Sequence, residues 1–398
     1  MSLPPYDPKP LALDSEYLRK VMLELLDISS PSGRTDHVTQ YVGERLSALG
    51  IPFTLTRRGA ISAYLPGRST TGTDRAIVVH TDTIGCIVKR LKENGRLEVN
   101  QIGTHSARFA EGAHVRVFTD DLERVVTGQI LPLKASGHRY NEGVDLQGVG
   151  WPQVEVRLDE PVSDIGGLRD LGIDVGDFVA MLPQPTITPS GYVKSRHLDD
   201  KAGVAAVLTA FKALVDSGVR PPITAHLLIT CTEEIGHGAS HGLDPDVAEI
   251  VSVDAAVVAP GQQSREEVVT VAMADSVGPF DYHLSRKLAA LAADHGIEVV
   301  RDVFDYYRSD VAAAVEAGAH ARVALLGFGV DASHGHERTH LDGLEGLAQL
   351  IGLYVQTDLV FPEWDNESGS GGQLVGFPSL AVQPASSEGP REGPIGLE

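Results

Sequence analysis

An apolar segment that ends at two adjacent carboxylates constrains the fold more than any other feature of the chain. The run Ile223-Thr-Ala-His-Leu-Leu-Ile-Thr-Cys-Thr leads directly into Glu233 and Glu234. Such a run is typical of a buried strand, whereas two like charges side by side repel each other and shift each other's pKa. A strand that ends in this pair calls for a metal ion or an acid–base reaction. The sequence therefore predicts a sheet with a reactive site at its strand ends.

Helices and strands alternate on both sides of this segment. Residues 15–27, for example, carry apolar side chains at helical spacing. The predicted helices cover 15–27, 35–49, 202–217, 282–296, 309–317 and 342–358, and the predicted strands cover 52–56, 76–79, 223–231, 250–258 and 321–328. Strands that alternate with helices of this length predict an α/β fold with a mostly parallel sheet flanked by helices.

The stretch 87–190 has a different pattern. Short β-like runs alternate there with turns that contain Gly and Pro, at 87–91, 114–117, 125–131, 153–158 and 178–182. Apart from a turn near 163–171, no helix of normal length is expected. This pattern predicts a small β-barrel, residues 87–190, inserted into a main domain made of residues 1–86 and 191–361. The Gly-, Ser- and Pro-rich segment 362–398 is predicted to be a disordered tail.

Composition narrows the class of protein. The chain has 398 residues and a formal net charge of −21, which argues against nucleic acid or an anionic membrane as a partner. No apolar run approaches the length of about 18 residues that a membrane span needs, and no signal peptide is evident. Two cysteines, Cys86 and Cys231, are too few for a disulfide framework, so we expect a cytoplasmic location.

Two short motifs supply further candidate side chains near predicted strand and helix ends. His80 ends a predicted strand, and Asp82 follows two residues later, from where it can orient the imidazole. Asp199 and Asp200 lie at the start of a predicted helix. Either aspartate could simply cap that helix. Alternatively, one of their carboxylates could bridge two cations.

The remaining candidates follow later strands. Asp254 interrupts a buried strand, where an unpaired carboxylate is costly, so it needs either a metal or a salt bridge. His334, His336 and His340 follow the last predicted strand, and at least one of them is expected to bind metal. Ligands in open α/β sheets gather at the carboxyl ends of strands. A set of His, Asp and Glu without Cys indicates a hydrolytic zinc, cobalt or manganese centre.

The order of these motifs resembles the co-catalytic metallopeptidases, and most closely the tetrahedral aminopeptidases. Members of that family are also called glutamyl or deblocking aminopeptidases, or cellulase M. The resemblance covers about residues 15–358 and rests on His80-Thr-Asp-Thr-Ile-Gly85, Ser195-Arg-His-Leu-Asp-Asp-Lys-Ala-Gly203, Thr232-Glu-Glu-Ile-Gly-His-Gly-Ala239 and Ser309-Asp310.

The resemblance implies a role for each matched residue. It implies that two divalent metal ions are bound, with zinc favoured, by His80, Asp199, Glu234, Asp254 and His334. Asp199 would bridge the two ions, and the peptide bond after it would be cis. Glu233 would be the general base, and Asp82 would orient His80. The resemblance also implies a large homo-oligomer, such as a tetrahedral dodecamer.

The chain departs from the family pattern near the last ligand. Thr83 stands where the family has Glu. The segment Asp331-Ala-Ser-His-Gly-His-Glu-Arg-Thr-His340 replaces the usual Arg-Tyr-x-His-Ser. His336 is therefore an alternative to His334. The same text resembles a subgroup found near genes for the osmoprotectant N-acetylglutaminylglutamine amide.

Together these features predict an aminopeptidase that removes N-terminal residues from peptides. The free α-amine of the substrate would bind a metal or an acidic side chain such as Asp310. The alternatives are an amidohydrolase or deacylase acting on a small N-acyl or dipeptide-amide metabolite and, from a different class, a non-catalytic binding protein. The intact Glu233 argues against the last of these.

Overall fold

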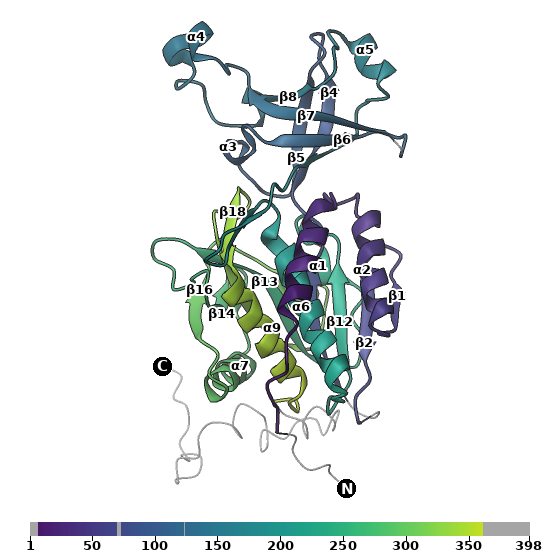
Figure 1. Ribbon diagram of the computed structural model, residues 1–398, viewed down its shortest axis with the longest axis vertical. Helices are drawn as coiled ribbons and strands as arrows, with labels where there is room; N and C mark the ends of the chain where they lie inside the picture. The colour runs from purple at the N-terminus through teal and green to yellow at the C-terminus, as the bar shows by residue number, and fades with distance from the viewer. Residues whose placement is uncertain (1–6, 70–72, 123, 361–398) are drawn as a thin grey trace, which may run out of the picture.

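A twelve-stranded sheet and a closed six-stranded barrel make up the computed structural model (Figure 1). The structure describes residues 7–69, 73–122 and 124–360. The tail predicted at 362–398 lies outside the described residues. Within the described ranges, no helix is long and apolar enough to cross a membrane.

Four parallel strands form the centre of the sheet. They are, in spatial order, β12 (Ala225–Thr230), β3 (Asp74–His80), β13 (Val247–Val258) and β17 (Arg322–Asp331). The register places Thr230 beside His80, and Asp254 beside Gly327. Because the strands are parallel, their carboxyl ends lie at one edge of the sheet. The parallel centre predicted from the sequence is confirmed.

Antiparallel strands extend the sheet on both sides, so the sheet as a whole is mixed. β1 (Phe53–Leu55) and β2 (Ile61–Leu65) lie on one side, and β18 (Glu337–His340), β11 (Tyr192–Ser195) and β10 (Thr186–Ile187) lie on the other. β14 (Val269–Asp275) pairs with β17, and it carries β15 (Gly278–Pro279) and β16 (Val299–Val303). Of these strands only β1 was predicted from the sequence; β2, β10, β11, β14, β15, β16 and β18 were not.

Helices cover both faces of the sheet. They are α1 (Ser15–Asp27), α2 (Asp36–Ala48), α6 (Leu198–Ser217), α7 (Tyr282–Asp294), α8 (Asp310–Glu316) and α9 (Leu341–Val355), together with the short 3-10 turn η3 (Gly238–Ser240). Their positions agree with the predicted ranges. Alternate side chains of β3 enter different cores: Ile77 and Val79 pack in the core that contains α1, α6 and α9, whereas Val78 packs with Val311 of α8. This two-residue alternation is what a strand buried on both faces requires.

The inserted segment folds into the predicted barrel. Its strands are β4 (Gly85–Leu91), β5 (Leu97–Ile102), β6 (His114–Phe118), β7 (Val125–Pro132), β8 (Val154–Leu158) and β9 (Phe178–Met181), closed in the order β4-β5-β8-β7-β6-β9. The short helices α3 (Ala107–Ala110), α4 (Gly137–Tyr140) and α5 (Ile165–Asp170) and the turns η1 (Asn141–Gly143) and η2 (Trp151–Gln153) lie between the strands. The barrel has its own apolar core. The exact domain boundaries at 87 and 190 stay a prediction.

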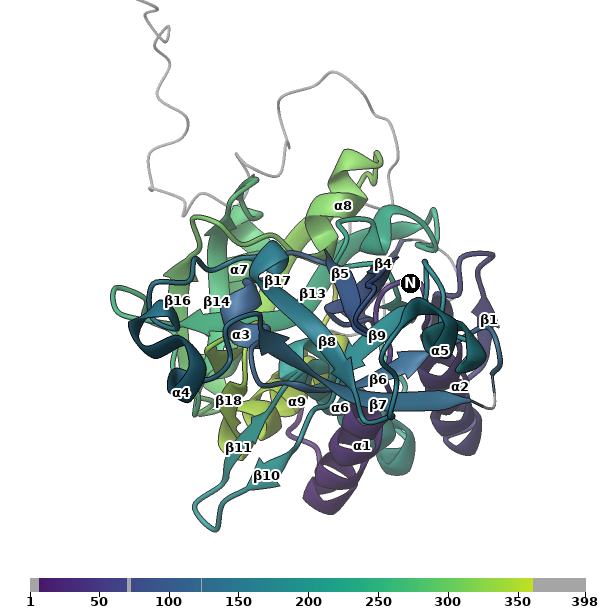
Figure 2. The ribbon, with the colours of Figure 1, turned by 90° about the horizontal axis from the view of Figure 1, so that it is seen from above.

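The barrel lies beyond the carboxyl ends of the parallel strands (Figure 1), and it overlies the sheet in the view from above (Figure 2). The chain passes from β3 into β4 with only four residues between the two strands, Thr81, Asp82, Thr83 and Ile84. The backbone at Gly103, just after β5, approaches the backbone oxygen of Glu234, so that an added Cβ would lie 3.3 Å from it. The fold therefore brings a barrel loop to the strand ends where the sequence places its candidate residues.

Candidate metal centre

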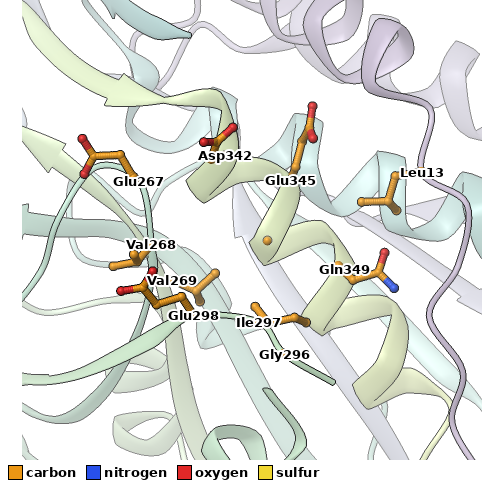
Figure 3. Close-up of a pocket in the computed structure, with 11 residues that line it drawn as sticks. Leu13, Glu267, Val268, Val269, Gly296, Ile297, Glu298, Asp342, Glu345 and Gln349 are labelled. Atoms are coloured by element: carbon orange, nitrogen blue, oxygen red, sulfur yellow. The ribbon is translucent and has the colours of Figure 1, made fainter. Parts of the chain in front are cut away.

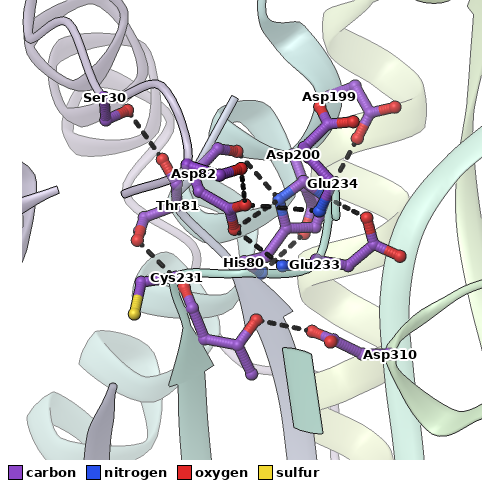
Figure 4. A network of polar contacts seen from close by, with 12 residues as sticks. Ser30, His80, Thr81, Asp82, Asp199, Asp200, Cys231, Glu233, Glu234 and Asp310 are labelled. Atoms are coloured by element: carbon purple, nitrogen blue, oxygen red, sulfur yellow. Dashed lines mark hydrogen bonds and ion pairs between the residues drawn. The ribbon is translucent and has the colours of Figure 1, made fainter. Parts of the chain in front are cut away.

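His80 and Asp82 form the centre of a polar network at the end of β3 (Figure 4). The Nδ1 of His80 donates to the backbone carbonyl of Asp82 at 3.0 Å, while the nearest Asp82 carboxylate oxygen is 3.6 Å away. That carboxylate instead accepts the backbone N–H groups of Glu233 and Glu234 at 3.0 and 3.2 Å, and the Ser32 hydroxyl at 2.5 Å. Asp82 thus orients the imidazole through its main chain and positions the glutamate pair through its side chain.

Asp199 lies between two imidazoles at the beginning of α6. Its Oδ1 is 3.1 Å from Nε2 of His80, and its Oδ2 is 3.5 Å from Nε2 of His334. The Asp199–Asp200 peptide bond is cis, as the family resemblance implies. Asp199 and Asp200 have non-helical backbone angles within the assigned range of α6, and the Oδ2 of Asp200 accepts the N–H of His80 at 3.3 Å. One carboxylate with its two oxygens directed at different imidazoles has the arrangement of a bridging ligand.

Glu233 and Glu234 diverge immediately after β12. The Oε2 of Glu233 lies 3.9 Å from Nε2 of His80. The Oε2 of Glu234 lies 3.4 Å from Nε2 of His334, and its Oε1 accepts the N–H of Ile84 at 3.2 Å. The two neighbouring glutamates therefore serve different halves of the site, as the sequence analysis expects.

Asp254 and His334 complete the cluster. Asp254 is buried within β13, with Oδ1 at 3.9 Å from Nε2 of His80. His334 follows β17, and its Nδ1 donates to the carbonyl of Thr104 in a barrel loop at 2.7 Å. His336 is exposed and lies outside the cluster. The barrel thus fixes the orientation of His334, and the geometry favours His334 over His336 as the last ligand.

The six side chains form two groups, each of which could hold a metal ion. His80, Glu233 and Asp254 make the first group, and Asp199, Glu234 and His334 make the second, with the donor atoms of each group within 4.8 Å of one another. All donors are nitrogen or oxygen, which suits a divalent hydrolytic metal. The residues present therefore fit a two-metal site.

The electrostatics of the cluster also support a metal site. Burial raises the pKa of Glu233 and of Asp254 well above their usual values, and the neighbouring carboxylates add to this effect. Burial opposes the charge on His334, but Glu234 and Asp199 outweigh it and raise the pKa of His334 to about 11. Carboxylates that are this crowded and buried need positive charge to ionise together, and bound cations supply it.

Glu337 is a functional candidate that the sequence analysis missed. It is buried in β18, where its two oxygens accept the N–H of His334 at 2.9 Å and of Asp199 at 3.2 Å. Burial and the charge of Asp199 raise the pKa of Glu337 to about 8. One carboxylate therefore ties together the backbones of two candidate ligands. The available signal in the sequence was a carboxylate between His336 and Arg338, but the histidines around it were the more obvious candidate ligands.

Asp310, suggested as an acidic group for the substrate amine, is hydrogen-bonded to two other segments of the chain. It is buried, and its oxygens accept the Thr230 hydroxyl and the Ala239 N–H, both at 2.8 Å. Its Oδ1 would lie 1.3 Å from a Cβ at Gly238, so the two segments are in close contact. Asp310 therefore fixes the loop after Glu234, and its suggested contact with the substrate amine stays a prediction. Motif order alone could not show which way this side chain points.

A separate surface cavity lies away from this chemistry (Figure 3). Its volume is about 330 Å³, and it lies between α9 and the segments 267–269 and 296–298. The carboxylates of Glu267, Glu298, Asp342 and Glu345 line it, and none of the six clustered residues does. Since it contains no candidate ligand, we assign it no part in catalysis.

The α/β sheet, the inserted barrel and the paired donor groups together define a class of peptide-bond hydrolases. The M42 glutamyl aminopeptidase family matches residues 59–350, so the chain belongs to this family of metallo-aminopeptidases. A relative from Bacillus subtilis (strain 168), named "Putative aminopeptidase YhfE", is 37% identical over 341 residues, covering 86% of this chain and 98% of that protein.

Solved structures share the fold. The aminopeptidase APDkam598 from the archaeon Desulfurococcus kamchatkensis superimposes with a TM-score of 0.78 at 20% identity, covering 90% of this chain and 99% of that one. The Pyrococcus horikoshii TET1 peptidase, which can assemble into a tetrahedron or a large octahedral shell, gives a TM-score of 0.75 at 20% identity, with 86% and 100% coverage.

Proposed function

We propose that this protein is a two-metal aminopeptidase that removes N-terminal residues from peptides. The observation that carries the proposal is the position of Asp199, whose two oxygens face the imidazoles of two adjoining donor groups. His80 and Asp254 would hold one ion, Glu234 and His334 the other, and Asp199 both. When bound, divalent ions supply Lewis acidity and lower the pKa of a water molecule. Zinc suits this donor set best, with cobalt and manganese as alternatives.

Glu233 would act as the general base. It is clustered with His80 and Asp254, yet its side chain is more exposed, at 13%, than the Asp254 side chain, at 3%. The carboxylate would take a proton from the attacking water and deliver it to the nitrogen of the leaving amine. The Asp82 carboxylate holds the N–H of Glu233 and so fixes the position of the base.

Metal removal and substrate choice test this proposal together. Purified protein should contain about two divalent ions per chain and should cleave aminoacyl-anilides and peptides with free N-termini. Chelation followed by dialysis should abolish hydrolysis, and added zinc, cobalt or manganese should restore it. Turnover only of N-acylated or amidated dipeptides would instead establish the metabolite hydrolase, including the osmoprotectant subgroup. Absence of both metal and turnover would refute the mechanism.

Assembly into a large homo-oligomer is part of the same proposal. The barrel loops expose Leu122 and Leu146, which are 77% and 80% accessible in the single chain. Large exposed apolar side chains suit burial against other copies. Light scattering that gives a monomer mass would contradict this expectation. Cys86 and Cys231 are buried and unpaired, which supports the predicted cytoplasmic location.

A further inference from the structure

The loop between β17 and β18 holds His334 in a backbone conformation that needs support. His334 has a φ of 62°, and Ala332 has a φ of 57°. Both values lie in the left-handed region, which residues other than glycine rarely adopt and which persists only where surrounding contacts hold it. His334 belongs to the second donor group, with Asp199 and Glu234. The contacts that hold this loop therefore decide where one candidate ligand lies.

Two side chains hold the loop on the side that faces the barrel. The Nδ1 of His334 donates to the carbonyl of Thr104 at 2.7 Å. The guanidinium of Arg196 donates to the carbonyl of Phe109 at 2.8 Å and to that of Gly335 at 3.4 Å. These contacts fix the imidazole and the residue after it against the barrel. The position of the loop relative to α6 depends on a further residue.

Glu337 links the loop to α6. It is buried in β18, where it lies opposite Ser195 of β11, the strand that leads into α6. Its Oε1 accepts the N–H of His334 at 2.9 Å, and its Oε2 accepts the N–H of Asp199 at 3.2 Å. One carboxylate therefore spans the backbones of two ligands that are far apart in the chain. The side chains of these ligands approach to 3.5 Å.

The first donor group is positioned in a different way. His80 ends β3 and Asp254 lies within β13, and these two parallel strands pair directly in the central sheet. The backbone hydrogen bonds between the strands fix the spacing of these two ligands. In the second group, Asp199 and His334 lie outside the strands. Glu337 supplies the link between them that the sheet supplies in the first group.

We propose that Glu337 is a positioning residue for the second metal ion, because it sets the separation of Asp199 and His334 at which a single cation can bind both side chains. This inference deepens the proposed function and rests on its two-metal site. Glu337 is 1% exposed, so it acts through the two ligands and not on the substrate. Its removal should free the loop that carries His334 and weaken the second ion selectively, while the first group stays intact.

The test measures cobalt binding by calorimetry after chelation has removed all metal, with Glu337→Gln and Glu337→Ala as the variants. Glutamine keeps the shape of the side chain but has one acceptor oxygen in place of two, and alanine has none. One of the two binding events should weaken by about 10- to 100-fold in Glu337→Gln, and by more in Glu337→Ala. The other event should keep its wild-type affinity. Asp331→Asn, which changes an exposed carboxylate at the end of β17, is the control and should match wild type.

A second background identifies which ion is affected. Asp254→Asn removes a ligand of the first group, so the single ion that this variant retains is expected in the second group. Adding Glu337→Gln to Asp254→Asn should weaken binding of that ion by the same factor. Excess cobalt should also restore the kcat of the single variant Glu337→Gln to the wild-type range with KM unchanged. A residue that only stabilised the fold would not give this rescue.

The contrary outcomes separate this inference from the proposed function. Two binding events of wild-type affinity in both Glu337 variants would refute the inference. Equal weakening of both events, or a Glu337→Gln chain that stays unfolded in excess cobalt, would also refute it, because either result makes Glu337 a support of the whole fold. Wild-type protein that binds two ions but hydrolyses no peptide would refute the aminopeptidase function alone, since the inference is read from metal binding. Wild-type protein that binds no metal would refute both.

Discussion

Buried carboxylates at the two ends of the central sheet have different partners. Glu249, near the start of β13, is fully buried but has partners: its Oε2 accepts the Tyr354 hydroxyl at 2.7 Å, its Oε1 accepts the Val360 N–H, and Arg75 lies beside it on β3. Asp254, further along the same strand, accepts the N–H of Ala255, and its carboxylate lies 3.9 Å from the Nε2 of His80, with Asp199 and Glu233 as charged neighbours. One end of the sheet is complete without ligands, whereas the other needs cations.

The arginine explains the difference. Arg75 is fully buried, donates to the carbonyls of Tyr354 and Thr357, and stacks on the Tyr354 ring at 4.4 Å. A guanidinium supplies fixed positive charge at the end of the sheet where β3 and β13 begin. At the carboxyl end, the imidazoles of His80 and His334 are outnumbered by carboxylates. Burial of a charge thus indicates a structural role where a cation is built in, and a functional role where the cation is missing.

Glu233→Gln should give the largest change of the four variants considered. The amide keeps the shape of the side chain but cannot accept the water's proton, so kcat should fall by about 10²- to 10⁴-fold. Metal content and the urea midpoint should stay close to wild type, because the backbone N–H of residue 233 still donates to Asp82. Steady-state kinetics with elemental analysis measures both. Full activity with two bound metals would show that another group is the base.

Arg75→Met should lower stability and leave metal binding intact. It removes the cation from the end of the sheet where β3 and β13 begin. The loss leaves the carbonyls of Tyr354 and Thr357 without their donor and removes the positive charge beside the buried Glu249, which costs about 3–5 kcal/mol of unfolding free energy. Metal binding should persist in the folded fraction. The exposed Arg90→Met, whose side chain is 69% accessible, is the control and should change stability by less than about 1 kcal/mol. Equal stabilities for the two variants would contradict the structural role assigned to Arg75.

Lowering the pH should protonate His105 and His334 over different pH ranges, because the fold shifts their pKa values in opposite directions. Burial lowers the pKa of His105 to about 4, because His105 has no hydrogen-bonded counter-charge, unlike His334. A folded pKa below the usual 6.5 contributes stability that is complete above pH 6.5 and is lost as pH falls toward 4. Between pH 7 and pH 5 the loss is on the order of 2 kcal/mol.

The measurement is urea unfolding of wild type and His105→Gln at several pH values. Glu234, with a pKa raised to about 7, has the opposite trend, so only the difference between the two proteins isolates His105. The advantage of wild type over the variant should shrink as pH falls. A difference that stays constant from pH 7 to pH 5 would show that His105 is not held neutral by the fold.

Asp254→Asn should give a small effect on stability, and one of unusual sign. Burial and Asp199 raise the pKa of Asp254, so ionising this carboxyl in the metal-free fold is costly above its usual value of 3.8. Removing the charge should stabilise the metal-free protein by about 1 kcal/mol at pH 8 and by less at pH 4. Bound metal should drop to about one ion per chain. Destabilisation at pH 8 would mean that Asp254 has a cation partner within the protein.

Much of the fold could be predicted from the sequence, because local patterns carry it. The apolar stripe of 15–27 and the run before Glu233 each define an element without reference to the rest of the chain. The short runs between 87 and 190 predicted the barrel for the same reason. β5, β14 and β16 were not predicted, because the conformation of such a run depends on the strands with which it pairs.

The sequence by itself determined which residue types gather at the strand ends and in what order, since parallel strands bring their carboxyl ends to one edge. Only the tertiary structure decided where each side chain points. It turned Asp310 inward onto Thr230, engaged the Asp82 carboxylate with the glutamate backbone, and placed Glu337 against the cluster. These contacts join residues far apart in the chain. Their distances follow from how the strands, helices and barrel pack, and no local pattern records that packing.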